Sequence, residues 1–189
     1  KYAHEQKKFI LDVGLQQKHK VLEIGCGYLR LGEFLIKYLR SGQYYGCDIS
    51  EDIIKMSLKK VKSKRLQQKN PTVWNNEDLK FNNLKSDFFD YAFAFSVFTH
   101  IPLKEIDEVI KAIRRLLKPK GIFYASFYIN DNQVIKKKFS DVSYHYPLNK
   151  IAKICSKYGL QIKVVPYPGN QTMIEIKKIN SKNNGKEFY

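Results

Sequence analysis

The sequence predicts an α/β fold: a doubly wound, mostly parallel sheet of seven strands with one antiparallel final strand, covered by helices on both faces. Three observations support it. Short apolar runs alternate with segments of helical spacing, which favours a parallel sheet. The pair Gly25 and Gly27 follows the first apolar run. The last two apolar runs are separated only by the turn "PGN" (168–170), so they must pair antiparallel.

Apolar runs of strand length predict the seven strands. The longest of them, "YAFAFSVF" (91–98), suits a buried strand and is far shorter than the roughly 18 residues of a membrane span. The expected strands are 20–25, 44–49, 72–75, 89–98, 122–129, 160–167 and 171–178.

Helical spacing and terminal residues predict the helices that alternate with these strands. Ser50 is a suitable N-cap for a helix that opens with acids and turns basic. Pro102 opens another helix with the same charge order, and "KPKG" (118–121) ends it. The expected helices are 1–19, 29–40, 50–65, 102–117 and 147–159.

One domain is expected, because 189 residues with 43% hydrophobic content suffice for one core but not for two comfortable ones. The Rossmann-like domain covers 20–178, behind a leading helix at 1–19 and ahead of a flexible tail at 179–189. Residues 130–146 are expected to form an irregular, polar and aromatic insert. The chain opens at Lys1 without a methionine, so we expect it to be trimmed or cut from a longer chain.

The cysteines and the N-terminal sequence indicate a cytoplasmic protein. The three cysteines are scattered and lack CxxC pairing, which argues against a disulfide framework and a zinc site. No signal-peptide pattern opens the chain. The oligomeric state is left open by the sequence.

The net charge of +16 favours nucleic-acid binding, but the type of basic residue does not. Only five of the 34 basic residues are arginine, which recognises phosphates and bases better than lysine does. Frequent lysine and asparagine suggest an AT-rich genome. The composition therefore favours solvated lysine faces over nucleic-acid binding.

The turn after the first strand is the expected ligand site, since ligands bind beyond strand carboxyl ends at the switch point of such sheets. Gly25 and Gly27 allow a sharp bend and a close ligand approach. Glu23 lies in an apolar strand, where a carboxylate needs a partner. Asp48, 21 residues after Gly27, suits ribose hydroxyls. Arg30 occupies the third position of the GxGxxG fingerprint, which disfavours a nicotinamide enzyme. A structural turn and a helix cap are the simpler alternatives.

At these residues the chain resembles a family. "VLEIGCG" followed by "YYGCDIS" is similar to the first two motifs of class I S-adenosylmethionine-dependent methyltransferases, and the resemblance covers about residues 20–178. "DYAFAFSVFTHIP", "IRRLLKPKGIFYASF" and "YPGNQTMIEI" resemble a bacterial branch of small-molecule methyltransferases, often encoded with surface-glycan enzymes. The resemblance implies S-adenosylmethionine as cofactor and the reversed final strand.

For the methionine end of the cofactor, the resemblance implies contacts with the glycine turn. The backbone around Gly25, Cys26 and Gly27 would lie against the methionine part, and Glu23 would take its amino group. Arg30 could pair with a carboxylate or phosphate of cofactor or substrate.

For the nucleoside end, the resemblance implies contacts after the second and third strands. Asp48 would hold the ribose diol, and Ile49 would pack on the adenine. Either Glu77 or Asp78 would reach the adenine amine, and we prefer Asp78.

The sequence defines less clearly the end of the site where the methyl acceptor would bind. Ser96, together with Phe95 and Val97, would border the transferring methyl group. Methyl transfer from a sulfonium needs mainly alignment, but a hydroxyl acceptor benefits from a base. His100 and His145 are the candidate catalytic residues; a backbone-bonded residue before a helix and ordinary loop packing are the alternatives.

Three family signatures are missing around 96–102. The segment "SVFT" (96–99) replaces the [DN]PPY stretch of amino-directed nucleic-acid enzymes, and no cysteine lies near Ser96 as in cytosine-C5 enzymes. "FSVFTHIP" (95–102) offers none of the acids through which catechol-type enzymes bind a metal, so no metal is expected.

The sequence therefore predicts a cytoplasmic enzyme that methylates a small molecule, most simply a hydroxyl of a sugar or sugar nucleotide. An RNA or protein methyltransferase, favoured by charge alone, and a non-catalytic cofactor-binding module remain open as alternatives.

Overall fold

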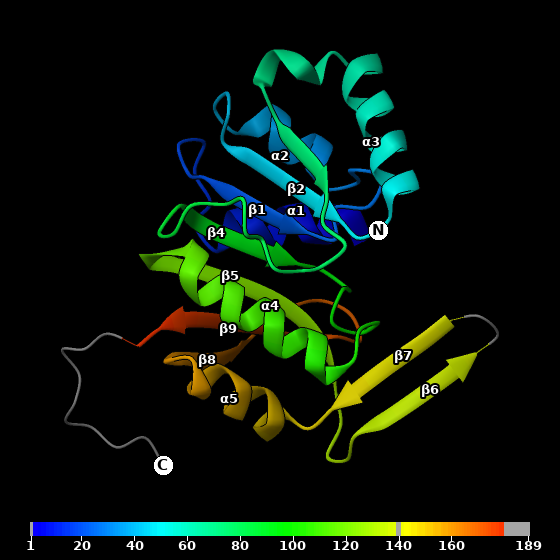
Figure 1. The fold of residues 1–189 in the computed structure, drawn as a ribbon, viewed down its shortest axis with the longest axis vertical. Coiled ribbons are helices and arrows are strands. Elements are labelled where there is room, and N and C mark those ends of the chain that lie inside the picture. Colours follow the sequence, from blue (N-terminus) through cyan, green and yellow to red (C-terminus); the bar gives the residue numbers. More distant parts are fainter. Residues whose placement is uncertain (1, 139–140, 180–189) are drawn as a thin grey trace.

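The computed structural model describes residues 2–138 and 141–179 of the chain. These residues form α-helices, one 3₁₀ helix and strands in a single sheet system (Figure 1). The helices are α1 (Tyr2–Asp12), α2 (Gly32–Tyr38), α3 (Glu51–Ser63), η1 (Leu66–Lys69), α4 (Leu103–Leu116) and α5 (Leu148–Lys157). The strands are β1 (Val21–Ile24), β2 (Tyr44–Asp48), β3 (Thr72–Asn75), β4 (Phe89–Ala94), β5 (Leu117–Ile129), β6 (Val134–Lys138), β7 (Asp141–Tyr146), β8 (Leu160–Val165) and β9 (Thr172–Lys178).

Seven of these strands form the main sheet, in the order β3-β2-β1-β4-β5-β9-β8. The pairs between β3 and β5 are all parallel, whereas β9 runs antiparallel to both β5 and β8. Only residues 166–171 join β8 to β9, too few for a crossover between parallel strands. The predicted mostly parallel sheet with a reversed final strand is therefore confirmed.

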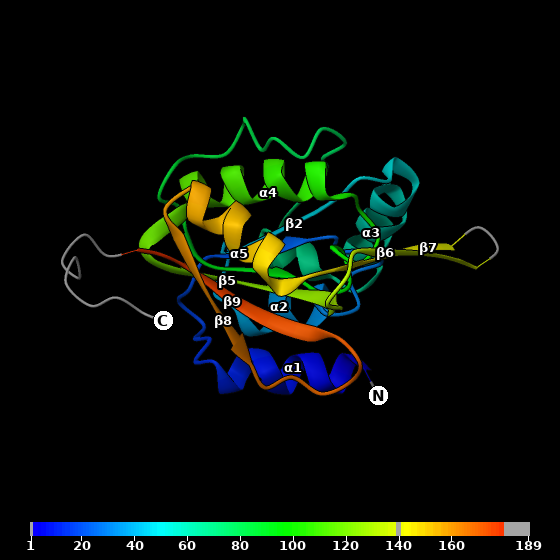
Figure 2. The same ribbon diagram turned by 90° about the horizontal axis from the view of Figure 1, so that it is seen from below.

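Helices cover both faces of the sheet, and each face has its own core (Figure 2). Successive residues of a strand point to opposite faces. Phe123 accordingly packs in the core beneath α4 and α5, while Tyr124 packs in the core beneath α1, α2 and α3. In α4, the buried residues Ile106, Ile110 and Ile113 recur at helical spacing and form the stripe that contacts the sheet.

The prediction of an irregular insert at 130–146 is wrong, because this segment forms a hairpin of β6 and β7. The hairpin projects from the domain beside the end of β5 (Figure 1). β5 extends beyond the main sheet and pairs with β7 at Tyr128↔His145 and Ile129↔Tyr146. Tyr146 is fully buried, and its hydroxyl donates to the Ile101 carbonyl at 2.9 Å. The free backbone edge of β5 thus orders a polar segment that has no strong strand pattern of its own.

The leading segment and the tail differ from the predicted bounds. Within 1–19, the described helix is α1, and a turn and loop follow it before β1. Of the predicted tail at 179–189, only Ile179 belongs to the described residues. Among the described residues, none of the helices has both the length and the apolar content that a membrane span requires.

Candidate functional site

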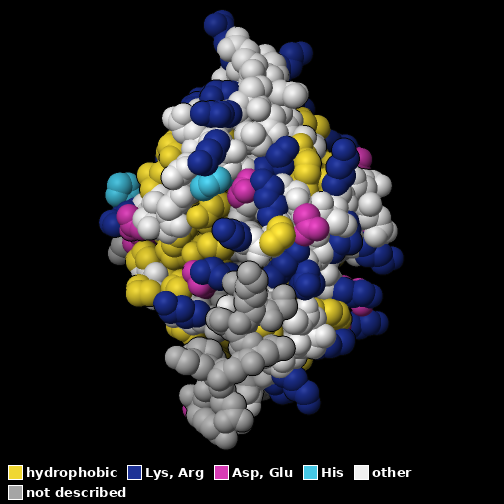
Figure 3. Space-filling model, turned by 90° about the vertical axis from the view of Figure 1, so that its left-hand side faces the viewer, with side chains coloured by type: hydrophobic (Ala, Val, Ile, Leu, Met, Phe, Trp, Pro, Cys, Tyr) yellow, Lys and Arg dark blue, Asp and Glu magenta, His cyan; other side chains and the backbone are white. Residues whose placement is uncertain are grey.

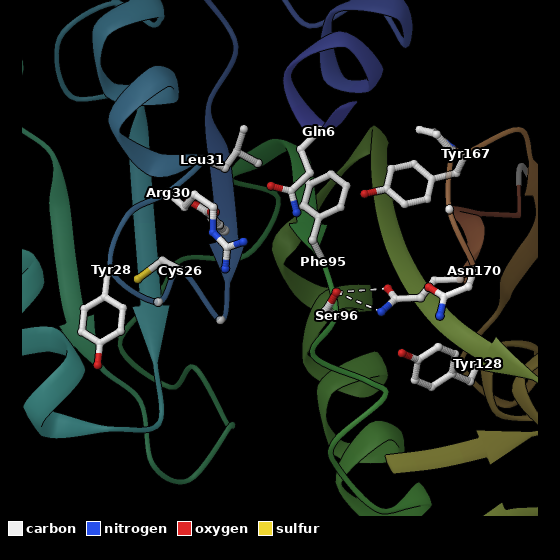
Figure 4. A pocket seen from close by; sticks show the side chains of 16 residues that line it. Gln6, Cys26, Tyr28, Arg30, Leu31, Phe95, Ser96, Tyr128, Tyr167 and Asn170 are labelled. Atoms are coloured by element: carbon white, nitrogen blue, oxygen red, sulfur yellow. Dashed lines mark hydrogen bonds between the residues drawn. The ribbon is translucent and has the colours of Figure 1, made fainter. Parts of the chain in front are cut away.

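A cavity of about 500 Å³ opens at the carboxyl ends of β1 and β4. The turn after β1 forms one wall, and the end of β5 and the loop at 166–171 form the opposite wall (Figure 4). α1 contributes Gln6. Seven of the predicted site residues line this cavity: Glu23, Gly25, Cys26, Gly27, Arg30, Phe95 and Ser96.

The glycine turn is fixed to the end of β2 by its own backbone. The N–H groups of Gly25 and Cys26 donate to the Cys47 carbonyl at 2.8 and 2.9 Å. The Gly27 N–H donates to Asp48 Oδ2 at 3.0 Å, and the other Asp48 oxygen accepts from the Ser50 N–H at 3.1 Å. These bonds place the Asp48 carboxylate beside the turn, although Asp48 is not itself one of the residues that line the cavity.

Gly25 brings the turn close to the loop after β4. Its φ is +70°, a conformation that favours glycine, and a Cβ atom there would overlap Val97 Cγ2. The absence of a side chain therefore allows two strand-end loops to meet at the cavity.

The change Gly25→Ala is expected to lower the free energy of unfolding by about 2–4 kcal/mol, because backbone strain and overpacking against Val97 add together. Urea unfolding measures the loss. Gly159→Ala is the matched control, since Gly159 has φ +66° and open space around its Cβ position. Equal losses in the two variants would contradict a role for the Val97 contact.

Glu23 presents a buried carboxyl group to the cavity. It is 5% exposed, and its Oε2 accepts a hydrogen bond from the Tyr44 hydroxyl at 2.5 Å. Burial raises the pKa of Glu23 to about 8; the Tyr44 hydrogen bond opposes this increase, and the charge of Asp48 adds to it. A cation brought into the cavity would stabilise the carboxylate form.

Two other polar groups of the turn differ in charge. Burial raises the pKa of Cys26 far above its ordinary value, so its thiol is neutral and not a nucleophile. The Arg30 guanidinium is directed into the space between the two walls (Figure 4). Among the described residues, no carboxylate pairs with Arg30, so its charge is available to an anionic group of a ligand.

Ser96 lies two residues after the end of β4, and its backbone is strained. Its φ is +58°, which is unusual for a residue other than glycine. Its N–H donates to Ser126 Oγ at 2.8 Å, and its hydroxyl exchanges hydrogen bonds with the Gln171 amide at 3.0 and 3.1 Å (Figure 4). Strain of this kind persists where surrounding contacts hold it, often at functional sites.

The lining residues missed in the sequence include Gln6, Tyr128, Tyr167 and Gln171. The reversed β9 brings the loop before it to the carboxyl edge of β5, and this loop supplies Tyr167 and Gln171. Phe9 anchors α1 through edge-on contacts with Tyr124 and Tyr167, at centroid distances of 5.2 and 5.3 Å. The "PGN" turn signalled the loop, but nothing local signalled the position of α1.

The predicted nucleoside contacts lie outside the cavity itself. Ile49 is 54% exposed beside Asp48. Glu77 is exposed, and Asp78 accepts a hydrogen bond from the Lys80 N–H at 3.0 Å. Their contacts with an adenine stay predictions.

The two predicted catalytic histidines also lie outside the cavity lining. His100 Nδ1 is 3.1 Å from the Val142 carbonyl oxygen of the hairpin. The His145 ring stacks on Tyr128, a lining residue, with centroids 4.7 Å apart. Burial lowers the pKa of His145, and the charge of Lys136 lowers it further, so its imidazole is neutral at physiological pH. Their catalytic roles stay predictions.

The described part of the chain contains no group of three or more His, Cys, Asp or Glu side chains placed to hold a metal ion.

Residues 22–123, more than half of the chain, match the family described as methyltransferase domain. The chain therefore belongs to the methyltransferase domain family. This assignment confirms the class predicted from the "VLEIGCG" and "YYGCDIS" motifs, the S-adenosylmethionine-dependent methyltransferases.

One curated relative that the chain resembles is also a methyltransferase. The phosphoethanolamine N-methyltransferase of Plasmodium falciparum is 25% identical over 122 residues, which are 65% of this chain and 44% of that protein. The chain thus spans less than half of that relative's length.

Two solved structures show the same fold. Magnesium protoporphyrin IX methyltransferase from Synechocystis PCC 6803, solved with bound SAM, has a TM-score of 0.70 at 20% identity over 94% of this chain and 81% of that chain. An S-adenosylmethionine-dependent methyltransferase from Clostridium acetobutylicum has a TM-score of 0.72 at 14% identity over 93% and 90%.

Proposed function

We propose that this chain transfers a methyl group from S-adenosylmethionine to a small molecule. The observation that carries the proposal is the joining of the glycine turn to Asp48 beside a cavity that also holds the buried Glu23 carboxyl. Glu23 would receive the cofactor's amino group, and Arg30 its carboxylate. Asp48 would accept hydrogen bonds from the ribose hydroxyls. This donor and acceptor set fits the cofactor's groups.

The bound cofactor would supply the electrophilic methyl group, and the protein would align the acceptor with it. Alignment by a cavity of fixed shape can contribute several kcal/mol to catalysis, up to roughly 7–11 kcal/mol in ideal cases. Phe95, Tyr128 and Tyr167 exclude water from the acceptor end, while Ser96 and Gln171 orient the acceptor by hydrogen bonds.

Our finer proposal for the acceptor is a hydroxyl group of a sugar or sugar nucleotide, in a bacterial surface-glycan setting. Aromatic faces at Tyr128 and Tyr167 beside the neutral polar groups of Gln6 and Gln171 suit a polar ring. His145 is our candidate for the base, since its neutral ring lies one side chain behind the cavity. We also propose cytoplasmic localisation, which the free cysteines support.

A second candidate acceptor is an amine. Among the described residues that line the cavity, only Glu23 has a carboxyl group and only Arg30 a cationic side chain, and both belong to the proposed cofactor end. A neutral amine can attack the methyl group without a protein base in contact with it. The Plasmodium relative is named for such an acceptor.

On one face of the molecule (Figure 3), the basic side chains of the described residues form no patch that would favour a polymeric acceptor. Lysine and arginine side chains are spread over the face in Figure 3 and interleaved with acidic and apolar side chains. A nucleic-acid enzyme would be expected to gather them in a patch or stripe.

The test incubates the purified chain with S-adenosylmethionine and separate fractions of sugar nucleotides, small amines and RNA. We expect S-adenosylhomocysteine to form with a small-molecule fraction, and mass spectrometry of the product identifies the methylated atom. Formation with RNA alone would contradict the small-molecule acceptor. Tight binding of S-adenosylhomocysteine without turnover on any fraction would favour the non-catalytic module.

A further inference from the structure

Tyr44 contacts the predicted cofactor site from inside the protein. It lies at the start of β2, is 2% exposed, and does not line the cavity. Its hydroxyl donates to Glu23 Oε2 at 2.5 Å. Among the described residues, no other side chain donates a hydrogen bond to Glu23. The Tyr44 phenol is therefore hydrogen-bonded to a carboxyl group that faces the cavity.

Two glycines leave the room that this phenol needs. A Cβ atom on Gly46 would overlap the Tyr44 hydroxyl, and one on Gly32 would lie 2.5 Å from it and 3.0 Å from Glu23 Oε2. Gly46 is in the middle of β2, and Gly32 is the first residue of α2. Glycine inside a strand often marks a close approach of this kind. The absence of a side chain at both glycines thus leaves room for the Tyr44 phenol beside the Glu23 carboxyl.

We propose that Tyr44 is a positioning residue, which orients the Glu23 carboxylate at the cavity wall to receive the amino group of the bound cofactor. The inference rests on the proposed function, because it needs an ammonium group in the cavity. Tyr44 does not touch the cofactor and acts only through Glu23.

The charges around Glu23 explain why this hydroxyl matters. Asp48 and Cys47 approach from β2 and Cys26 from the glycine turn, and none of these groups is a cation. Arg30 lines the same cavity. Burial and Asp48 both raise the pKa of Glu23, and the Tyr44 hydrogen bond lowers it. Without this hydroxyl, the carboxylate forms only at higher pH.

The test compares Tyr44→Phe with the wild-type chain by calorimetry between pH 6.5 and 9. The probes are S-adenosylhomocysteine and 5′-methylthioadenosine, which lacks the amino-acid end. At pH 7.5 we expect Tyr44→Phe to weaken S-adenosylhomocysteine binding about 10-fold and to move its pH dependence upward. Affinity for methylthioadenosine should stay unchanged.

Tyr45→Phe is the matched control, since Tyr45 is the next residue of β2 and packs on Phe88 and Phe89. It should change neither affinity. A second variant, Tyr44→Phe on a Glu23→Gln background, should weaken S-adenosylhomocysteine binding no further than Glu23→Gln alone.

Three results would overturn the inference. One is an equal loss of affinity for both probes, another is an unchanged pH profile, and the third is additive losses in the double variant. If the wild-type chain binds neither probe, the proposed function fails together with the inference. If the wild-type chain binds both probes and Tyr44→Phe binds them with the same affinity, only the inference is overturned.

Discussion

Asp48→Ala is expected to weaken S-adenosylhomocysteine binding at least 100-fold, which is about 2.8 kcal/mol. Hydrogen bonds to a charged group contribute about 1.5–3 kcal/mol each. The variant removes the proposed acceptor of the ribose hydroxyls. It also removes the acceptor of two backbone hydrogen bonds, which the N–H groups of Gly27 and Ser50 donate to Asp48 at 3.0 and 3.1 Å. Calorimetric titration measures the loss.

Asp52→Ala is the control for Asp48→Ala, because its side chain is 90% exposed on the first turn of α3. It removes the same charge four residues away and should leave the affinity unchanged. Asp48→Asn retains one oxygen for a backbone N–H and should fall between the two. An Asp48→Ala variant with wild-type affinity would contradict the placement of the ribose.

Glu23→Gln is expected to weaken S-adenosylhomocysteine binding strongly but measurably, and yet to raise the stability of the ligand-free protein. The amide keeps an oxygen for the Tyr44 hydroxyl but carries no charge for an ammonium group. Burial raises the pKa of Glu23 to about 8, against about 4.3 in an unfolded chain. The contribution of this group to stability is therefore complete below about pH 4.3 and is lost as the pH rises towards 8.

The stability gain of Glu23→Gln should accordingly grow between pH 6 and pH 8. At pH 8 we expect the melting temperature to rise by several degrees, since about 1 kcal/mol corresponds to about 2–4 °C in a domain of this size. Calorimetric melting of the ligand-free protein gives the readout. Glu33→Gln, an acid with part-exposed ion pairs to Lys37 and Lys60, is the comparison and should not raise the melting temperature. A gain independent of pH would contradict the role of the charge.

The affinity of the wild-type chain for S-adenosylhomocysteine should also depend on the ionisation of Glu23. Below pH 8 the protonated Glu23 offers an ammonium group no charge, so affinity for S-adenosylhomocysteine should increase from pH 6.5 to pH 8. Isothermal titrations in buffers of different ionisation enthalpy should show proton release on binding at pH 7. Constant affinity across this range would contradict an ionisation linked to binding.

Local signals in the sequence predicted the sheet and one side of the site. Apolar runs and helical spacing are properties of neighbouring residues, and they placed β3 at its observed bounds. The motif spacing from Gly27 to Asp48 likewise reflects one strand-helix-strand unit, and a hydrogen bond joins the two residues.

The features missed in the sequence depend on contacts between distant residues. The β6–β7 hairpin is ordered by the free edge of β5, and the loop with Tyr167 reaches the cavity only because β9 is reversed. Glu23 and Tyr44 lie on adjacent strands, and their partnership depends on side-chain direction and on space left by Gly46. Spacing along the chain contains none of this information.

The reversed β9 has an evolutionary consequence. The family match ends at residue 123, and the loop at 166–171 lies beyond it, although both parts border one cavity. That loop joins two strands at the border of the sheet, so its length and side chains can change without disturbing the central strands. If the proposed function holds, selectivity for new methyl acceptors can therefore diverge in this loop while the proposed cofactor-binding residues stay constant.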